Sequence, residues 1–173
     1  MSVLAANGLV GYRFHRRAVT VGLVTVFCIG MLAAFFVSRY GNERMDLITA
    51  TEVAGMEQLY EVAPPDSLLV AVSDNVFWRF KDYELYDYAV FNEEVLDVGA
   101  AGIVARMRED VDARPSFLVL SRAQKAAMEL RYGYRAGEWD ELVRDLEATP
   151  GLERIFANED VQIYELIGPG ERP

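Results

Sequence analysis

The sequence predicts one N-terminal transmembrane helix followed by a small layered α/β domain with a parallel or mixed sheet. One observation is an uncharged run at residues 18–37, which is long enough to cross a bilayer as a helix. The other is that helical patterns alternate with short, continuously apolar runs along residues 49–167. Such runs are typical of strands covered on both faces, and their alternation with helices is typical of α/β domains. This length suffices for one hydrophobic core.

The apolar run, AVTVGLVTVFCIGMLAAFFV, indicates a retained membrane anchor. As a helix, its twenty residues would span about 30 Å, the thickness of the hydrocarbon core of a bilayer. A soluble core helix would normally carry a polar stripe, whereas this run carries only Thr20 and Thr25. A cleavable signal peptide has a shorter apolar region that ends at small residues, whereas this run ends with Phe35, Phe36 and Val37.

The basic residues beside the run predict its orientation. Arg13, Arg16 and Arg17 precede it, and Arg39 and Arg44 follow it. Because basic residues are enriched on the cytoplasmic side of a membrane, this bias favours a cytoplasmic amino terminus. We therefore expect a single-pass protein of the plasma membrane with its carboxyl-terminal domain outside the cytoplasm.

A linker, a helix and a strand are expected directly after the membrane run. Residues 38–48 form a polar juxtamembrane linker in this interpretation. Thr49 and Glu52 have the spacing of a capping box, which predicts a helix that continues until Pro64 and Pro65 stop it. Residues 68–72, LLVAV, are continuously apolar and rich in β-formers, which predicts a buried strand.

The rest of the domain is predicted from the same kinds of signal. Ser121 and Gln124 again have capping-box spacing, and apolar residues from Trp139 to Leu146 follow a helical period. The expected elements are helices at 97–108, 121–130 and 139–146, with strands at 117–120, 152–156 and 161–167. The predicted organisation is a basic cytoplasmic end (1–17), a transmembrane helix (18–37), the linker (38–48), an extracytoplasmic α/β domain (49–167) and a disordered tail (168–173).

Composition excludes several classes of function. The chain has 17 basic and 27 acidic residues, and because residues 1–37 hold three arginines and no acid, the remainder carries a net charge of −13. So acidic a domain repels a phosphate backbone, and we expect no nucleic-acid partner. The only cysteine is Cys28 and the only histidine is His15, so disulfides and cysteine or histidine catalysis are excluded from residues 38–173. No phosphate-binding glycine loop appears, and we expect no cofactor.

The densest local feature is the aromatic and acidic segment NVFWRFKDYELYDYAVF at residues 75–91. Aromatic rings beside carboxylates are suited to holding sugars, because the ring stacks on the sugar face while the acids bind its hydroxyl groups. The candidate ligand-binding residues are Trp78, Arg79, Asp82, Tyr83, Glu84, Tyr86 and Asp87. Alternatively, these aromatic residues pack a sheet edge against a helix or lie at the membrane interface. Asp82, Glu84 and Asp87 could also supply the carboxylate pair of a glycosidase.

Three sequence blocks resemble one known family. They are the E-V-x5-L-Y helix beginning at Glu52 with its Pro64-Pro65 stop, the F-W-R-F-x-D-Y-E-x-Y block at 77–86, and the N-x-D-V-x-I-Y ending at 158–164. Together with the preceding span, residues 20–167 resemble the carboxyl-terminal part of actinobacterial polytopic membrane proteins of the GT-C glycosyltransferase type. The resemblance implies a last span followed by an extracytoplasmic α/β domain. In such transferases the catalytic acid lies in an early loop between spans, and this sequence has no such loop.

Two functions of different classes follow. The first is a non-catalytic accessory domain or remnant of a glycosyltransferase-like membrane protein of the cell envelope. Its expected partners are the lipid bilayer and a polytopic membrane protein or an envelope glycan. The second is an autonomous carbohydrate-active enzyme or glycan-binding domain that uses residues 77–91.

Overall fold

The computed structural model describes residues 2–40, 43–78, 81–109 and 114–167, with side chains from Arg16 onward except that of Glu43. Arg79, part of the linker and the expected tail at 168–173 lie outside the described residues. The chain divides into two compact units, residues 1–43 and 44–173, and each is considered by itself.

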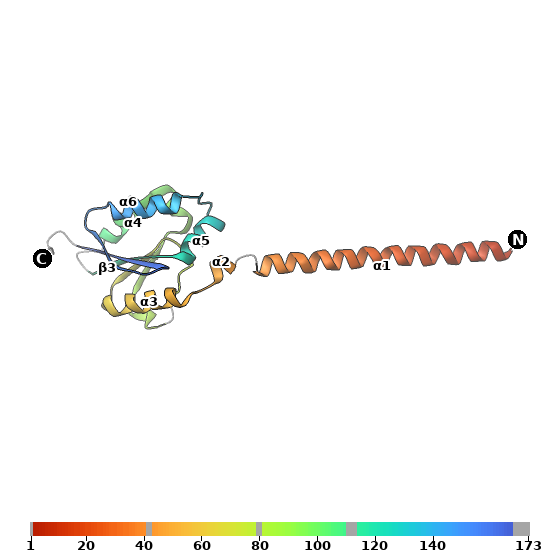
Figure 1. Cartoon of the computed structure of the whole chain (residues 1–173), viewed down its shortest axis with the longest axis horizontal. Coiled ribbons are helices and arrows are strands. Elements are labelled where there is room, and N and C mark those ends of the chain that lie inside the picture. The colour runs from red at the N-terminus through yellow and green to blue at the C-terminus, as the bar shows by residue number, and fades with distance from the viewer. Residues whose placement is uncertain (1, 41–42, 79–80, 110–113, 168–173) are drawn as a thin grey trace. The chain divides into compact units, whose positions relative to one another are not determined.

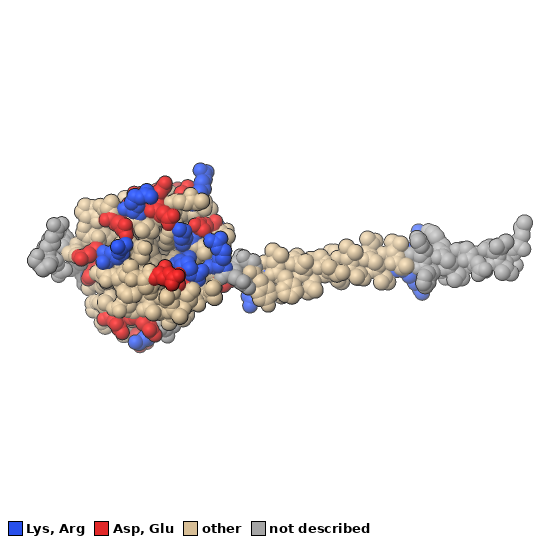
Figure 2. Space-filling model, viewed as in Figure 1, with Lys and Arg blue, Asp and Glu red and all other residues tan. Residues whose placement is uncertain are grey.

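Helix α1 (Ser2–Tyr40) makes up most of the first unit (Figure 1). It contains the whole of the predicted span, and every side chain of residues 18–37 is exposed. Figure 2 shows this stretch without a charged side chain. Within the described part of the chain, this is the one helix that is long and apolar enough to cross a membrane. A bare surface of Val, Leu, Ile and Phe is unfavourable in water.

The second unit is built on a five-stranded mixed sheet, which confirms the predicted fold class. Its strands are β1 (Leu68–Ala71), β2 (Asp87–Val90), β3 (Ser116–Ser121), β4 (Leu152–Ala157) and β5 (Val161–Leu166). They lie in the order β2-β1-β3-β5-β4. Strands β1, β2 and β3 are parallel, whereas β5 runs antiparallel to both β3 and β4.

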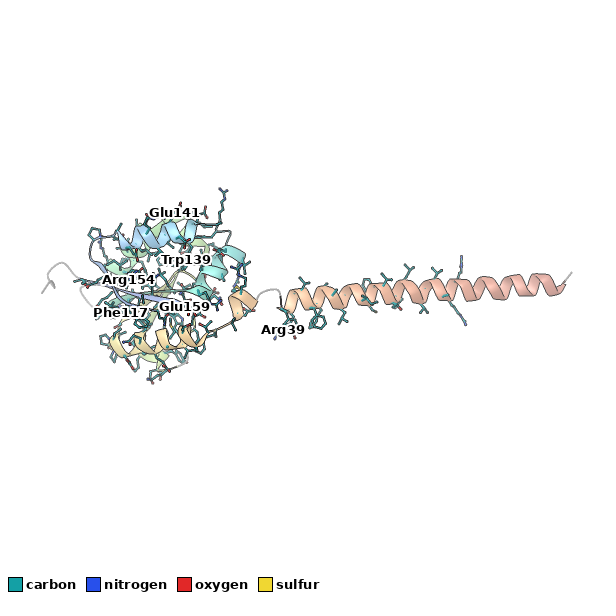
Figure 3. The ribbon with its side chains drawn as sticks, in the orientation of Figure 1. Arg39, Phe117, Trp139, Glu141, Arg154 and Glu159 are labelled. Carbon is teal, nitrogen blue, oxygen red and sulfur yellow. The ribbon has the colours of Figure 1, made fainter. Side chains whose placement is uncertain are left out.

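Helices cover both faces of the sheet (Figure 1). Helix α3 (Ala50–Val62) lies on one face, and α4 (Val95–Glu109) and α6 (Glu138–Glu147) lie on the other. The short helices are α2 (Glu43–Asp46), α5 (Arg122–Leu130), η1 (Tyr83–Leu85) and η2 (Asn92–Glu94). In Figure 3, Trp139 points from α6 toward the sheet, whereas Glu141 lies on the outer side of that helix.

Two apolar cores follow from the alternation of side chains along the strands. Leu68 and Val70 pack in the core beneath α4 and α6, and Leu69 and Ala71 pack in the core beneath α3. Strand β3 alternates in the same way, and Phe117 belongs to the α3 core. The central strands are buried on both faces, which explains why their sequences are continuously apolar.

A polar network joins three loops at one edge of the sheet. Glu52 forms the predicted capping box with Thr49, and its Oε1 atom accepts a hydrogen bond from the backbone N–H of Ala123 at 2.8 Å. Arg122 lies 3.3 Å from Glu52 and 3.6 Å from Asp160, which precedes β5. Thr49 and Thr51 donate hydrogen bonds to Asp160, and these bonds, more than the charge of Arg122, lower the pKa of that carboxyl.

Strand β2 was not predicted. It is a four-residue strand at the edge of the sheet, where β1 is its one partner among the described residues, and its side chains are half-buried or exposed. Without two buried faces it lacks the continuously apolar pattern of its neighbours. The predicted linker also contains the short helix α2. Arg122 donates hydrogen bonds to the backbone carbonyls of Arg44, within this helix, and of Leu47, just after it.

Candidate functional site at the carboxyl edge of the sheet

The three parallel strands end at the same edge of the sheet. Strand β1 lies between β2 and β3, so the connection from β2 to β3 must cross from one side of β1 to the other. In open α/β sheets, ligands bind outside the carboxyl ends of the strands where the strand order reverses. The segments there are residues 73–75 after β1, residues 92–94 after β2 and residues 122–124 after β3.

Gln124 holds the ends of β1 and β3 together. Its fully buried side chain accepts hydrogen bonds from the backbone N–H groups of Val72 at 2.9 Å and Ser73 at 3.3 Å. Its Nε2 atom donates to the carbonyl of Val119 at 3.0 Å. Ser121 caps α5 as predicted, but the Gln124 side chain reaches to β1 rather than back to the cap. This bonding fixes the loop that carries Asp74.

Asn75 ties the same loop to two further segments. Its Nδ2 atom donates to the carbonyl oxygens of Met45, at 2.8 Å, and Ala123, at 3.0 Å. The loop after β1 is therefore positioned by groups from α2 and from α5.

Asp74 is the centre of the site. Its backbone N–H donates to Oδ1 of Asn92 at 2.9 Å, and its own Oδ1 accepts a hydrogen bond from the Tyr132 hydroxyl at 3.1 Å. Asn92 has a positive φ of 53°, a conformation that asparagine tolerates better than most residues. The Asp74 Oδ2 atom lies 3.9 Å from Nη1 of Arg131, whose guanidinium stands 5.2 Å from the centre of the Tyr132 ring.

Among the described residues, Asp74 lines three hollows in the surface. The largest, of about 400 Å³, is lined by Val90 and Phe91 and by the polar or charged residues Asp74, Asn92, Glu93, Glu94, Arg131 and Tyr132. A second, of about 170 Å³, lies between the segment containing Met45 and the segment containing Asn75. A third, of about 220 Å³, lies beside Phe77 and Trp78. We call the largest of them the Asp74 hollow.

The Asp74 hollow is acidic, with three carboxylates and one guanidinium in its lining. Burial raises the pKa of Tyr132, and its hydrogen bond to Asp74 raises it further, so the phenol stays protonated and donates to that carboxylate. Among the described residues, no three acidic, histidine or cysteine side chains are grouped so that they could hold a metal ion.

The aromatic segment predicted as a ligand site does not line the Asp74 hollow as a group, and two of its rings pack inside the domain. Trp78 is 3% exposed and its ring centre lies 4.8 Å from that of Tyr88. Tyr86 packs against Tyr60 with 5.2 Å between ring centres and donates a hydrogen bond to the carbonyl of Ala63 at 3.2 Å. The interpretation that these aromatic residues pack the sheet edge against a helix agrees with these contacts.

The acidic members of that segment lie at the surface. Asp82, Tyr83 and Glu84 are exposed around η1, and Asp87 forms an ion pair with Arg114. The prediction that this segment binds a ligand remains a prediction.

The residues of the Asp74 hollow were not predicted from the sequence. One signal could have found Asp74 and Asn75, because polar residues directly after a buried strand lie at the edge where ligands bind. Tyr132 and Arg131 carry no such signal.

Comparisons with models of known families, with curated proteins and with solved structures found no match.

Proposed function

We propose that this protein is a single-pass protein of the plasma membrane whose acidic α/β domain lies outside the cytoplasm and acts as a non-catalytic binding domain. In this proposal it is accessory to a polytopic membrane protein that assembles cell-envelope glycans. The observation that carries the proposal is the exposed, uncharged surface of α1 over residues 18–37. Such a surface is stable when lipid covers it.

Charge supports the proposed orientation. Three arginines precede the apolar run and two follow it, and basic residues favour the cytoplasmic side. The domain after the run carries the net charge of −13 derived above. Acidic residues contribute little to orientation, so the argument rests on the arginines alone.

The geometry of the second unit favours binding over catalysis. A glycosidase needs two carboxyl groups facing each other across the sugar. Of the three acids in the aromatic segment, Asp87 is engaged by Arg114, whereas Asp82 and Glu84 are exposed. The Asp74 hollow, by contrast, presents carboxylate, phenol and amide groups at the edge where α/β sheets bind ligands. The glycan as partner rests on the family resemblance of the sequence.

Membrane anchoring and orientation can be tested with the full-length chain. We expect it to stay in the membrane pellet after carbonate extraction, and we expect protease added outside intact spheroplasts to digest the domain. The matched control is a cytoplasmic marker protein, which must survive the same treatment. Release by carbonate would overturn the anchor. A domain that stays uncut in spheroplasts but is digested after detergent lysis would overturn the orientation.

The proposal that the domain is non-catalytic needs its own experiment. The purified full-length chain is incubated with polyprenol-linked and free oligosaccharides, and products are analysed by mass spectrometry. We expect no turnover. Turnover that disappears in Asp82→Asn or Asp87→Asn would establish the autonomous enzyme instead.

A further inference from the structure

We propose that the Asp74 hollow binds its ligand through an organic cation, a protonated amine or a guanidinium group, with Oδ2 of Asp74 as the partner of that cation. This inference rests on the proposed function as a binding domain and adds the chemical class of its ligand.

The position of Arg131 is the first support. Its guanidinium stands over the Tyr132 ring and beside Oδ2 of Asp74, at 5.2 Å and 3.9 Å. A cation placed over an aromatic face and next to a carboxylate is favoured by both groups. The Arg131 side chain is 59% exposed and its distance to Asp74 is long, so the internal cation is weakly held and can be displaced.

The charge of the hollow is the second support. Glu93 and Glu94 lie in η2, immediately before α4. The start of a helix is where many α/β proteins bind phosphate, but here carboxylates of the chain itself lie beside it. With Asp74, they give the hollow a negative charge that attracts cations and repels anions.

The third support is that Asp74 is already held in position. Asn92 fixes its backbone and the Tyr132 hydroxyl binds its Oδ1 atom. The Oδ2 atom is the one that faces Arg131. A ligand cation therefore meets an oriented acceptor, which reduces the ordering cost of binding.

The binding experiment uses the purified full-length chain in phosphatidylcholine nanodiscs and titration calorimetry. The probes are agmatine, which carries a guanidinium group and a protonated amine on a plain carbon chain, glucosamine as an amino sugar, glucose as its neutral counterpart, and inorganic phosphate. We expect agmatine, glucosamine or both to bind, more weakly at high salt, and glucose and phosphate not to bind. A preference between agmatine and glucosamine shows whether the site favours a cation on a plain carbon chain or an amino sugar.

Two variants with opposite expected effects locate the site. Asp74→Asn keeps the shape and the backbone hydrogen bond, and we expect it to weaken amine binding by about tenfold or more. Arg131→Gln removes the internal cation, and we expect it to strengthen binding. The matched controls are Asp66→Asn, an exposed acid whose positive φ of 69° asparagine accepts, and Arg135→Gln, an exposed arginine that changes the net charge equally.

The inference is overturned if no amine binds, if glucose or phosphate binds as well as the amines, or if Asp74→Asn and Asp66→Asn have the same effect. Equal effects of Arg131→Gln and Arg135→Gln would show general charge attraction and would also overturn it. Such failures leave the carbonate and protease results unchanged. Conversely, if the membrane anchor or its orientation is wrong, the carbonate extraction or the protease experiment will show it. Amine binding by the purified chain would still occur in that case.

Discussion

Gln124 and Val72 are 52 residues apart in the sequence, yet the Oε1 atom of Gln124 accepts a hydrogen bond from the backbone N–H of Val72 at 2.9 Å. The same atom accepts the N–H of Ser73. One buried amide thus satisfies the backbone where β1 ends and the loop to Asp74 begins. In a buried position, a backbone donor without an acceptor is costly.

We therefore expect Gln124→Leu to lower the free energy of unfolding of the domain by about 3 kcal/mol, because two buried N–H groups lose their acceptor. Urea denaturation of the full-length chain in nanodiscs, followed by circular dichroism, measures the change. Gln58→Leu, at a half-buried position of α3, is the control and should cost less. Equal losses in the two variants would contradict this role of Gln124.

Trp78 lies in the core, and we expect its loss to cost as much stability as the loss of a core side chain does. Because its ring is 3% exposed and packs on Tyr88, Trp78→Ala should lower the free energy of unfolding by about 3–5 kcal/mol. The fluorescence of Trp139 reports the transition. Phe77→Ala is the matched control, since that neighbour is 36% exposed and should lose less. A loss below about 1 kcal/mol for Trp78→Ala would revive a surface or ligand role.

Gly55 lies where α3 packs closely against Val161 of β5. A Cβ atom there would lie 2.7 Å from Cβ of Val161, so the helix would have to shift. Replacement of glycine by alanine within a helix normally stabilises by about 1 kcal/mol. Here we expect Gly55→Ala to destabilise the domain by about 1–3 kcal/mol because of the clash. Ala54→Gly, at the exposed neighbouring position, is the control and measures the effect of helix propensity alone. If urea denaturation shows that Gly55→Ala stabilises the domain, the steric argument is refuted.

Asp160 contributes to the free energy of unfolding in a way that depends on pH, and the sign of this dependence follows from its pKa shift. Its pKa in the folded domain is lowered by hydrogen bonds from Thr49 and Thr51. The carboxylate therefore stabilises the fold above its ordinary pKa of about 4, and this stabilisation is lost as the pH falls through the folded value. We expect Asp160→Asn to be less stable than the wild type at pH 7, with the difference shrinking below about pH 4.

Urea denaturation at a series of pH values checks this expectation for Asp160. Glu159→Gln, at an exposed acid of the same turn (Figure 3), is the control and should show a smaller difference at neutral pH. A difference between Asp160→Asn and the wild type that stays constant at every pH would count against the proposed hydrogen bonds.

Elements with strong local signals were predicted from the sequence. The capping box of Thr49 and Glu52 and the apolar runs of β1 and β3 are each determined by neighbouring residues, and the structure confirms them. Strand β2 depends on pairing with β1 rather than on its own composition, so its sequence gave no signal.

The candidate site shows the same limit. Asp74 and Tyr132 are 58 residues apart and meet because β1 lies between β2 and β3, an order that local patterns do not contain. The sequence instead drew attention to a dense aromatic segment, and the structure uses Trp78 and Tyr86 of that segment in packing.

The place of β5 in the sheet has a consequence for how the domain is made. It follows the other four strands in the chain, yet it lies between β3 and β4 and pairs with both. While the ribosome is still adding residues before Val161, β4 has no neighbour and the sheet is split. The five-stranded sheet therefore cannot be completed before the segment Val161–Leu166 is available to pair with both β3 and β4.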